Sequence, residues 1–555
     1  MKLTSFWNDR TGFRTAILLT FVIMAAYMFM ASRTTLWDRD EPELARAAVE
    51  MMQSGNYLYP TFNNEIWPEK PILFFWLNIL SIKVLGPTAF ACRFWDTIAG
   101  GFACFLTFLL GRRLFTPQVG LWAMLILATT LMMLGVGTMA IIDPVLLPFQ
   151  LGAILIFTEG ILAGPRIWPA ILLGIALGLG MLAKGPIGLL PLPVIALMLW
   201  ANRKAPTGFW RPSLKVAAAC VIAALIFAAW AIPVNSATNG LFLRSFFGRE
   251  VVFRAVKPME HHGGNFLLYL FYYLPVIVVG FFPWTLHLPG AVSAVLGRRV
   301  GDRHARTLLI SWICPIFILM SLAATKLPHY IMFIWPALAV TVAAAIDAGR
   351  QNILNDRDRL WLRRGGWFFV PVAAGAAIGL VVAPWFIDAP GLRWPATLCG
   401  LILAVTVVIA MRHQYADRLL AASRVLLAGI IIFQVPFQLG AMPAVEHIKL
   451  TLPIAAAINE KTTKDTLVAS YKFNEPTLNF YVDRHIEELR NGQAVVAWSR
   501  RQNPGVLVIP RSVLADIEQR YGPLGMEEIA SKKGINYSKG NKLELVALLC
   551  GPKSR

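Results

Sequence analysis

Long apolar segments recur between residues 16 and 442, and this feature restricts the fold more than any other. A stretch of about 20 apolar residues is long enough to cross roughly 30 Å of hydrocarbon. Within lipid, each backbone N–H and C=O must be paired inside the segment, which favours helices. The chain as a whole is 57% hydrophobic and 15% charged, with a mean hydropathy of +0.60. These features predict a polytopic α-helical membrane protein.

We predict about 13 spanning helices. They cover residues 16–31, 88–110, 118–137, 143–163, 168–183, 186–201, 213–234, 266–289, 306–324, 328–346, 366–386, 394–411 and 424–442. The first run follows a basic head, as a signal peptide does. We expect it to be retained as a spanning helix, because an acidic motif comes directly after it.

The run 71–87 contains Asn78 and Lys83 and is near the lower length limit for a span. If it does not cross, the loops with Lys and Arg at 112–113, 166, 203–204, 298–306, 350–364 and 412–424 all lie on the N-terminal side. Basic loops are typical of the cytoplasmic side, so 71–87 is predicted to be an interfacial helix. The N-terminus is then cytoplasmic. The basic excess, 51 residues against 31 acidic ones, is interpreted as membrane topology and not as nucleic-acid binding.

Residues 446–555 differ in pattern from the membrane domain, which is predicted to cover 1–445. The segments 465–470, 505–510 and 543–549 resemble short strands, and 511–522 has helical spacing. This pattern predicts a small α/β domain, which the same topology places in the periplasm. A surface helix over 38–53 is also predicted, with Pro42 in its first turn.

Carboxylates gather on the predicted outer face. Asp38, Asp40 and Glu41 follow the first span, Glu69 precedes the interfacial helix, and Asp143 begins a later span in "MAIIDPVLLP". Acids beside a span often only cap a surface helix. Capping does not explain Asp143, because ionisable groups at membrane depth are costly and usually functional.

Basic residues on this face oppose the positive-inside trend. The set comprises Lys70, Lys184, Arg244, Arg249, Arg254, Lys257 and Lys326, with His329 and Tyr330 close to the last of them. Their alternative role is pairing with the nearby acids, and for Tyr330 it is anchoring in the aromatic belt. As a set they predict a site for a lipid phosphate, since ammonium and guanidinium groups bind phosphoryl oxygens.

A divalent metal ion such as zinc has one candidate site. Glu69, His261 and His262 provide ligand types that zinc accepts, although adjacent histidines rarely bind the same ion. Five of the six cysteines fall in apolar segments, so neither a disulfide framework nor a zinc finger is indicated.

Three segments resemble a known family. "DEPELARAAVEMMQSGNYLYP" (40–60), "EKPILFFWLNIL" (69–80) and "KLPHYIMFIWPALA" (326–339) are similar to the lipid A aminoarabinose transferases, which are undecaprenyl phosphate-4-amino-4-deoxy-L-arabinose arabinosyltransferases of the GT-C superfamily. The resemblance implies a GT-C fold and a bacterial inner-membrane enzyme. It also implies an undecaprenyl-phosphate-linked aminosugar donor, a lipid A acceptor, and resistance to cationic peptides such as polymyxin.

The resemblance assigns the family's "DE", "EKP" and "KLP" motifs to Asp40–Glu41, Glu69–Pro71 and Lys326–Pro328. We expect Asp40, Glu41 and Asp143 to be catalytic, with Asp38 accessory. The donor phosphate is expected to bind a basic and phenolic set that comprises Lys70, Lys326, Tyr330, Arg254, Arg244 and Lys257. A direct displacement would invert the anomeric centre.

Two alternatives remain open at this stage. Another polyprenyl-phosphate-dependent glycosyltransferase, such as a protein O-mannosyltransferase, would use the same kind of donor. A lipid transporter or flippase would also have many spans with buried charges, but repeated halves are not evident in the sequence.

Overall fold

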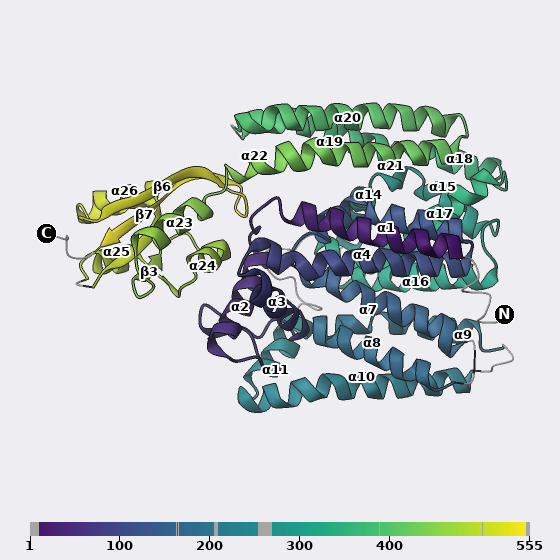
Figure 1. Ribbon diagram of the computed structural model, residues 1–555, viewed down its shortest axis with the longest axis horizontal. Helices are drawn as coiled ribbons and strands as arrows, with labels where there is room; N and C mark the ends of the chain where they lie inside the picture. The colour runs from purple at the N-terminus through teal and green to yellow at the C-terminus, as the bar shows by residue number, and fades with distance from the viewer. Residues whose placement is uncertain are drawn as a thin grey trace. The chain divides into compact units, whose positions relative to one another are not determined.

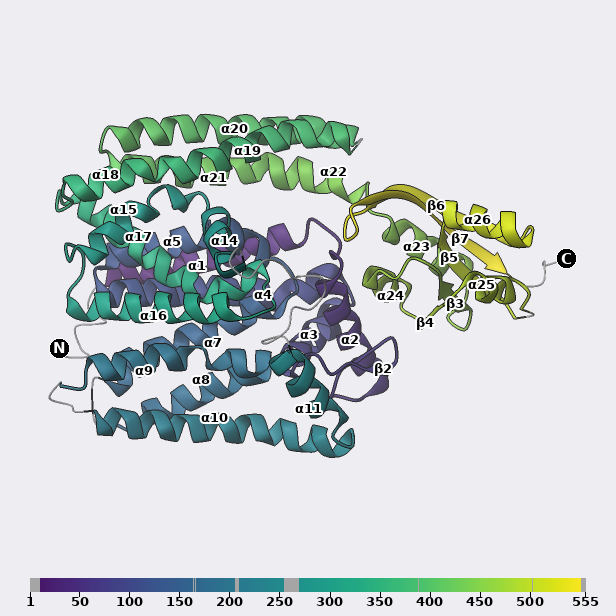
Figure 2. The ribbon, with the colours of Figure 1, turned by 180° about the vertical axis from the view of Figure 1, so that it is seen from behind.

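A computed structural model describes residues 10–162, 164, 166–204, 209–253, 269–387, 389–501 and 503–550. The chain divides into two units (Figures 1 and 2). Unit 1 comprises residues 1–32, 68–74 and 93–440, and unit 2 comprises 33–67, 75–92 and 441–555. The two units are described separately.

Unit 1 is a helical bundle. Its longer α-helices are α1 (Arg10–Ala31), α4 (Ala89–Leu114, whose first turn falls in unit 2), α5 (Pro117–Ala128), α7 (Ile142–Ile156), α8 (Trp168–Lys184), α9 (Pro191–Ala201), α10 (Trp210–Ala237), α16 (Arg303–Leu322), α17 (Trp335–Arg350), α19 (Gly366–Phe386), α20 (Pro390–Tyr415) and α21 (Leu419–Pro436). Shorter ones are α6 (Leu131–Val136), α11 (Leu241–Ser245), α14 (Tyr273–Gly280), α15 (Leu288–Leu296) and α18 (Asp356–Arg364). Short segments of 3₁₀ or π type are η2 (Phe157–Ile161), η3 (Gly185–Leu189), η4 (Phe246–Phe253), η5 (Trp284–Leu286), η6 (Pro328–Ile334) and η7 (Phe437–Ala441).

The centre of unit 1 is α17 together with η6, in which residues 331–348 are all buried. α17 packs against α5, α15 and α21, while α7 and α10 pack on either side of α8. The peripheral helices expose large apolar side chains, for example Trp394 on α20 at 84% and Phe386 on α19 at 77%. Such surfaces are stable in lipid and not in water, which fits a multi-pass membrane protein.

Within the described residues, ten helices are long and apolar enough to cross a membrane, so the predicted count of 13 is not confirmed. Three predicted spans are shorter or broken. The run 118–137 divides at Thr129 and Thr130, where the Thr130 side chain accepts a hydrogen bond from the N–H of Met133 and starts α6. The run 186–201 starts with η3 and leaves α9 only 11 residues, and the run 266–289 is interrupted by η5 after Pro283.

Unit 2 joins the first loop to the C-terminal residues. Its helices are α2 (Asp40–Ser54), α3 (Leu73–Leu85, whose first residues fall in unit 1), α22 (Met442–Glu446), α23 (Thr451–Lys461), α24 (Pro476–Val482), α25 (Gly492–Ser499) and α26 (Arg511–Tyr521). Its strands are β1 (Thr61–Phe62), β2 (Glu65–Ile66), β3 (Leu467–Ser470), β4 (Ile486–Glu488), β5 (Gly505–Pro510), β6 (Glu527–Asn536) and β7 (Asn541–Cys550).

The larger sheet has the strand order β4-β3-β5-β7-β6. β3 is parallel to both β4 and β5, whereas β7 is antiparallel to β5 and β6. Side chains from α23 and α24 pack on one face of the sheet, and those from α25 and α26 pack on the other. The predicted strands and the helix at 511–522 are therefore confirmed. β4 and β6 were not predicted. β4 has only three residues, and the residues of β6 are largely polar.

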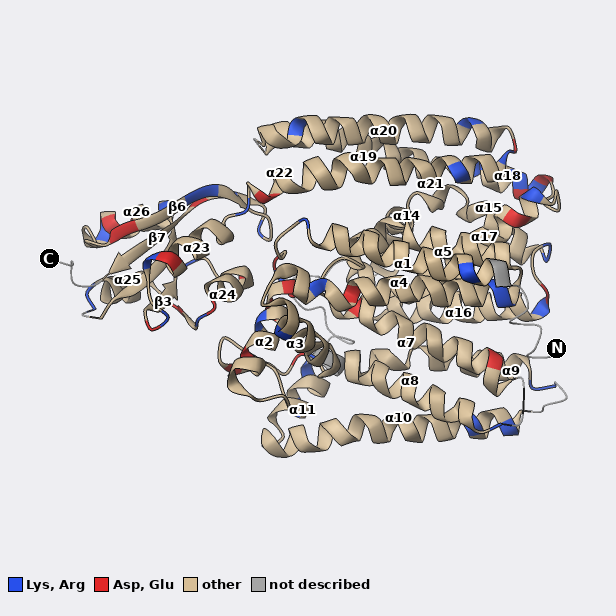
Figure 3. Cartoon of the chain, in the orientation of Figure 1, with Lys and Arg blue, Asp and Glu red and all other residues tan. Residues whose placement is uncertain are grey.

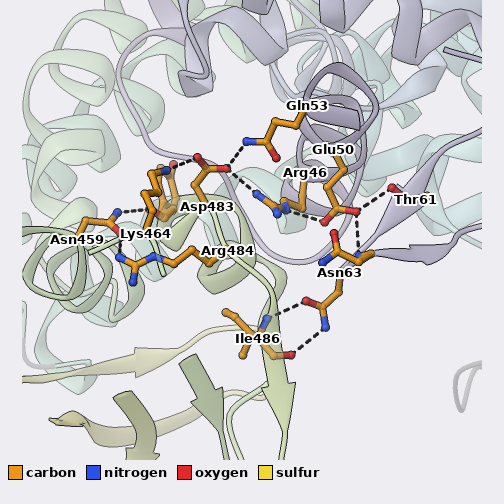
Figure 4. Close-up of polar contacts among 12 residues, drawn as sticks. Arg46, Glu50, Gln53, Thr61, Asn63, Asn459, Lys464, Asp483, Arg484 and Ile486 are labelled. Carbon is orange, nitrogen blue, oxygen red and sulfur yellow. Dashed lines mark hydrogen bonds and ion pairs between the residues drawn. The ribbon is translucent and has the colours of Figure 1, made fainter. Parts of the chain in front are cut away.

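The predicted surface helix corresponds to α2 (Asp40–Ser54), and it is followed by Gly55, whose φ of 69° suits a left-handed cap. α2 packs against α24, and it is buried over most of Glu41–Met51. The Arg46 guanidinium lies 2.7 Å from Glu50 Oε1 and 2.7 Å from Asp483 Oδ1 (Figure 4). In the same view the Asn63 amide pairs with the backbone N–H and C=O of Ile486, both at 2.9 Å, and so covers the edge strand β4.

Candidate active site at the ends of α7 and α8

A buried ion pair joins two neighbouring helix ends in unit 1. Asp143 is in the first turn of α7, and Lys184 is the last residue of α8, which packs beside it. Lys184 Nζ lies 2.5 Å from Asp143 Oδ2. Each charge also suits the dipole of its own helix, because acids are stabilised at N-termini and bases at C-termini. Gly185, with a φ of 59°, then lets the chain turn where a Cβ would meet the ring of Phe246 at 2.6 Å.

The turn η6 adds a histidine and a phenol to this pair. His329 Nε2 lies 3.7 Å from Asp143 Oδ2, and the Lys184 ammonium lies 4.7 Å from the centre of the Tyr330 ring. Tyr273 at the start of α14 is fully buried and donates its hydroxyl to the carbonyl of Leu327, at 3.3 Å. The side chains of Asp143, Lys184, His329 and Tyr330 therefore form one polar cluster in a mostly apolar bundle, which we call the Asp143 cluster.

Lys326 is held by its own loop. It is 3% exposed, and its ammonium donates to the carbonyls of Ser321, at 2.7 Å, and of Ala323. It also lies 5.3 Å from the centre of the Tyr269 ring. Burial lowers the pKa of this ammonium. Two of its three N–H donors thus bind carbonyls at the end of α16.

Glu69 and Lys70 form an ion pair with each other at 3.6 Å, and both are partly exposed. Lys70 is near enough to interact electrostatically with Asp143. The "EKP" motif therefore adds positive charge close to the Asp143 cluster, while Glu69 balances part of it.

Asp40 and Glu41 belong to unit 2 and differ in environment. Asp40 is exposed at the first residue of α2. Glu41 is fully buried, and its Oε2 accepts a hydrogen bond from the backbone N–H of Trp37 at 2.8 Å. Of this pair, Asp40 is therefore the one that can meet a substrate, whereas Glu41 holds the loop before α2.

Asp38 is held by the C-terminal residues of unit 2. Its carboxylate accepts hydrogen bonds from the backbone N–H and the hydroxyl of Thr477, both at 2.8 Å, and from the Tyr537 hydroxyl at 3.1 Å. Burial, reinforced by the charge of Glu475, raises the pKa of Asp38 to about 6, although the hydrogen bonds oppose the shift. A cavity of about 20 Å³ beside it has room for roughly one water molecule.

Comparison with known proteins shows similarity in sequence to sugar transferases. Residues 69–232 match the family described as dolichyl-phosphate-mannose-protein mannosyltransferase. The undecaprenyl phosphate-alpha-4-amino-4-deoxy-L-arabinose arabinosyl transferase of Edwardsiella ictaluri is 33% identical over 361 residues, 63% of this chain and 62% of that protein. The protein of the same name from Pectobacterium carotovorum is 31% identical over 378 residues, 66% of this chain and 64% of the relative. The chain thus spans less than two thirds of the length of these relatives.

A solved structure of ArnT from Cupriavidus metallidurans bound to undecaprenyl phosphate has a TM-score of 0.74 at 20% identity, and the match covers 97% of this chain and 99% of that one. The apo form of ArnT gives 0.75 at 19%, with the same coverage. The chain is similar to the aminoarabinose transferases in sequence and to ArnT in fold. Its fold is that of the GT-C glycosyltransferases, as expected from the three sequence motifs.

Four of the predicted site residues, Arg254, Lys257, His261 and His262, lie outside the described residues. Arg244 is described and is exposed on α11. Within the described ranges, no group of three His, Cys, Asp or Glu side chains could hold a metal ion. The zinc hypothesis depends on Glu69 together with the two histidines, so it stays a prediction.

Some buried polar residues were not predicted from the sequence. Tyr273 is one of several tyrosines in an apolar run, and its hydrogen bond to the "KLP" segment comes from a distant part of the chain. Arg93 and Asp96, in α4, are at most 1% exposed, and Arg93 donates to the carbonyl of Ala31 at 2.9 Å. A pair of opposite charges three residues apart on an apolar helix is the signal that would have identified them.

Proposed function

We propose that the chain transfers 4-amino-4-deoxy-L-arabinose from undecaprenyl phosphate to a phosphate of lipid A. The curated relatives carry the name of this activity. The observation that carries the proposal is the Asp143 cluster, in which a carboxylate, an ammonium, an imidazole and a phenol meet at the ends of apolar helices. Both proposed substrates are lipids whose reactive groups lie at the membrane boundary, where apolar helices end.

The basic residues are assigned to the leaving group. Breaking the bond to the sugar puts charge on the donor phosphate, and fixed ammonium groups in a water-poor site stabilise that charge. We assign this role to Lys70 and Lys326, together with Tyr330, whose ring lies near Lys184, and with Arg244 on α11. Arg254 and Lys257 remain predicted members of this phosphate-binding set.

The carboxylates are assigned to the sugar and the acceptor. A lipid A phosphate is already ionised near neutral pH and attacks without losing a proton, so no general base is required. Asp40 and Asp143 would then stabilise the sugar's ammonium group and the positive charge that develops on its ring. Glu41 would contribute by positioning the loop that carries Asp40.

We place the reaction at the periplasmic face of the bacterial inner membrane, with a cytoplasmic N-terminus and with residues 446–555 as a periplasmic domain. The support is charge: much of the Lys and Arg of unit 1 lies at one end of its long helices, the end where α18 lies (Figure 3), and basic loops favour the cytoplasm. Single cysteines placed in the α18 loop and after α2 should react with a membrane-impermeant thiol reagent in opposite compartments. Labelling of both from the same side would overturn this placement.

A second candidate is transfer to protein from another polyprenyl phosphate, which the family match over residues 69–232 favours. Mass spectrometry of lipid A and of membrane glycoproteins, from cells with and without the chain, separates the two. We expect an added aminopentose on lipid A that depends on Asp40. Unchanged lipid A together with a newly glycosylated protein would favour the second candidate.

A further inference from the structure

A charged groove in unit 2 has no role in the reaction described above. It has a volume of about 480 Å³, which is within the usual range for small-molecule sites. Its walls are the segment after β3, one side of α26 along its length, and the hairpin between β6 and β7. They include four basic residues, namely Lys472, Arg520, Lys539 and Lys542.

The groove lies at a topological switch point of the sheet. β3 and β5 are adjacent and parallel, but the helices that follow them lie on opposite faces, α24 on one and α26 on the other. In open α/β sheets, ligands bind in the crevice outside the carboxyl ends of two such strands. Tyr471 and Lys472 directly follow β3, and Pro510 ends β5, so the groove occupies that crevice.

The lining indicates the chemistry of the ligand. Among the described residues that form the walls, Asp516 is the single acid against four bases, which favours an anion. Tyr471 and Tyr521 add aromatic surface, and Asn536 and Asn541 add amides. Rings and amides beside bases suit a sugar that carries phosphate groups better than a bare ion.

The backbone at one wall supports a binding role. Lys472 has a φ of 60°, in the left-handed region that side chains other than Gly, Asn and Asp seldom adopt. Such conformations cost free energy and collect at functional sites. Lys472 and Arg520 are both exposed, so they are open to a ligand from solvent.

We infer that this groove binds a phosphorylated saccharide, the head group of the acceptor glycolipid. The source of the saccharide rests on the proposed function, whereas the binding chemistry rests on the groove alone. The groove would thus select the acceptor by its sugar phosphates and hold its head group on unit 2. The Asp143 cluster would act on the donor.

The test compares two double variants of the full-length protein in nanodiscs. Lys472→Gln with Arg520→Gln removes two positive charges from the groove, and Arg500→Gln with Lys533→Gln removes two exposed charges elsewhere in unit 2. Each is titrated calorimetrically with a diphosphorylated glucosamine disaccharide, with the unphosphorylated disaccharide and with inorganic phosphate. We expect the groove variant to bind the phosphorylated disaccharide roughly tenfold more weakly than the control variant, since charged hydrogen bonds are lost.

The transfer assay gives the second arm. The groove variant should raise the KM for lipid A by a similar factor and leave kcat and the donor KM unchanged. Equal affinities of the two variants for the disaccharide would overturn the inference, and so would equally tight binding of inorganic phosphate. If wild type binds the disaccharide through the groove but adds no sugar to lipid A, the groove inference stands and the proposed function fails.

Discussion

The pH dependence of Asp38 offers a direct test of how the C-terminal residues hold the loop before α2. Burial raises the pKa of Asp38 from 3.8 to about 6. The native state therefore takes up a proton at a higher pH than the unfolded chain does. Stability should rise as the pH falls from about 7 to about 4 and stay level below that, because both states are then protonated. The shift of about two pH units corresponds to about 3 kcal/mol.

The perturbation is Asp38→Asn, which keeps the shape and an acceptor oxygen for the Thr477 N–H but cannot ionise. Other acids titrate in the same range, so the informative quantity is the difference between wild type and variant. Hydrogen exchange of peptides from β3 and β5 in the full-length protein reports the stability of unit 2. After correction for the intrinsic exchange rate, the ratio of wild-type to variant protection should change by about two orders of magnitude between pH 4 and pH 7.5.

Thr477→Val gives a matched check, because it removes the hydroxyl that donates to Asp38 and keeps the backbone N–H. This hydrogen bond lowers the pKa, so its loss should move the transition to a higher pH. Parallel pH profiles for wild type and Asp38→Asn would refute the reasoning. They would mean that Asp38 has the same pKa in the folded and the unfolded chain.

Three further predictions concern charge. Asp40→Asn should abolish transfer and leave thermal unfolding unchanged, whereas Glu41→Gln should lower the unfolding temperature because it weakens the bond to Trp37; an active Asp40→Asn protein would remove Asp40 from the mechanism. Asp143→Asn and Lys184→Met should each destabilise unit 1 by about 3–5 kcal/mol, and the double variant by less than either, since a single change leaves one buried charge unpaired; additive losses in thermal unfolding would argue against the pair. Arg46→Met should cost more stability than Asp483→Asn, because it removes the basic partner of Glu50, which is only 3% exposed. Asp483 is less buried and also contacts Lys464 and Gln53. Equal protection of α2 in hydrogen exchange for the two variants would contradict this ranking.

The membrane part could be predicted well because lipid imposes one local rule, that apolar stretches form helices. The rule does not count spans reliably, as the division at Thr129 and Thr130 shows. A threonine inside an apolar run is neutral for hydropathy, yet it can cap a new helix.

For the candidate site, the motif around Asp143 could be predicted because a carboxylate inside an apolar run is unusual. Its pairing with Lys184 was one of two alternatives that the sequence left open, and only the packing of α7 against α8 decides between them.

The contacts of α2 lay beyond sequence reasoning for a different reason. In the sequence of α2, Leu44, Ala47, Ala48 and Met51 recur at three- and four-residue spacing, which predicts one apolar face and a solvated opposite face. In the structure Arg46 and Glu50 on that other face are also buried, because Asp483, more than 400 residues away, supplies a complementary charge. Periodicity shows that a face is polar but does not show which partner covers it. Because an unpaired buried charge is costly, the segment that carries Asp40 depends for its position on residues of the C-terminal part of unit 2. That part is therefore a structural requirement of the loop that holds a proposed catalytic group.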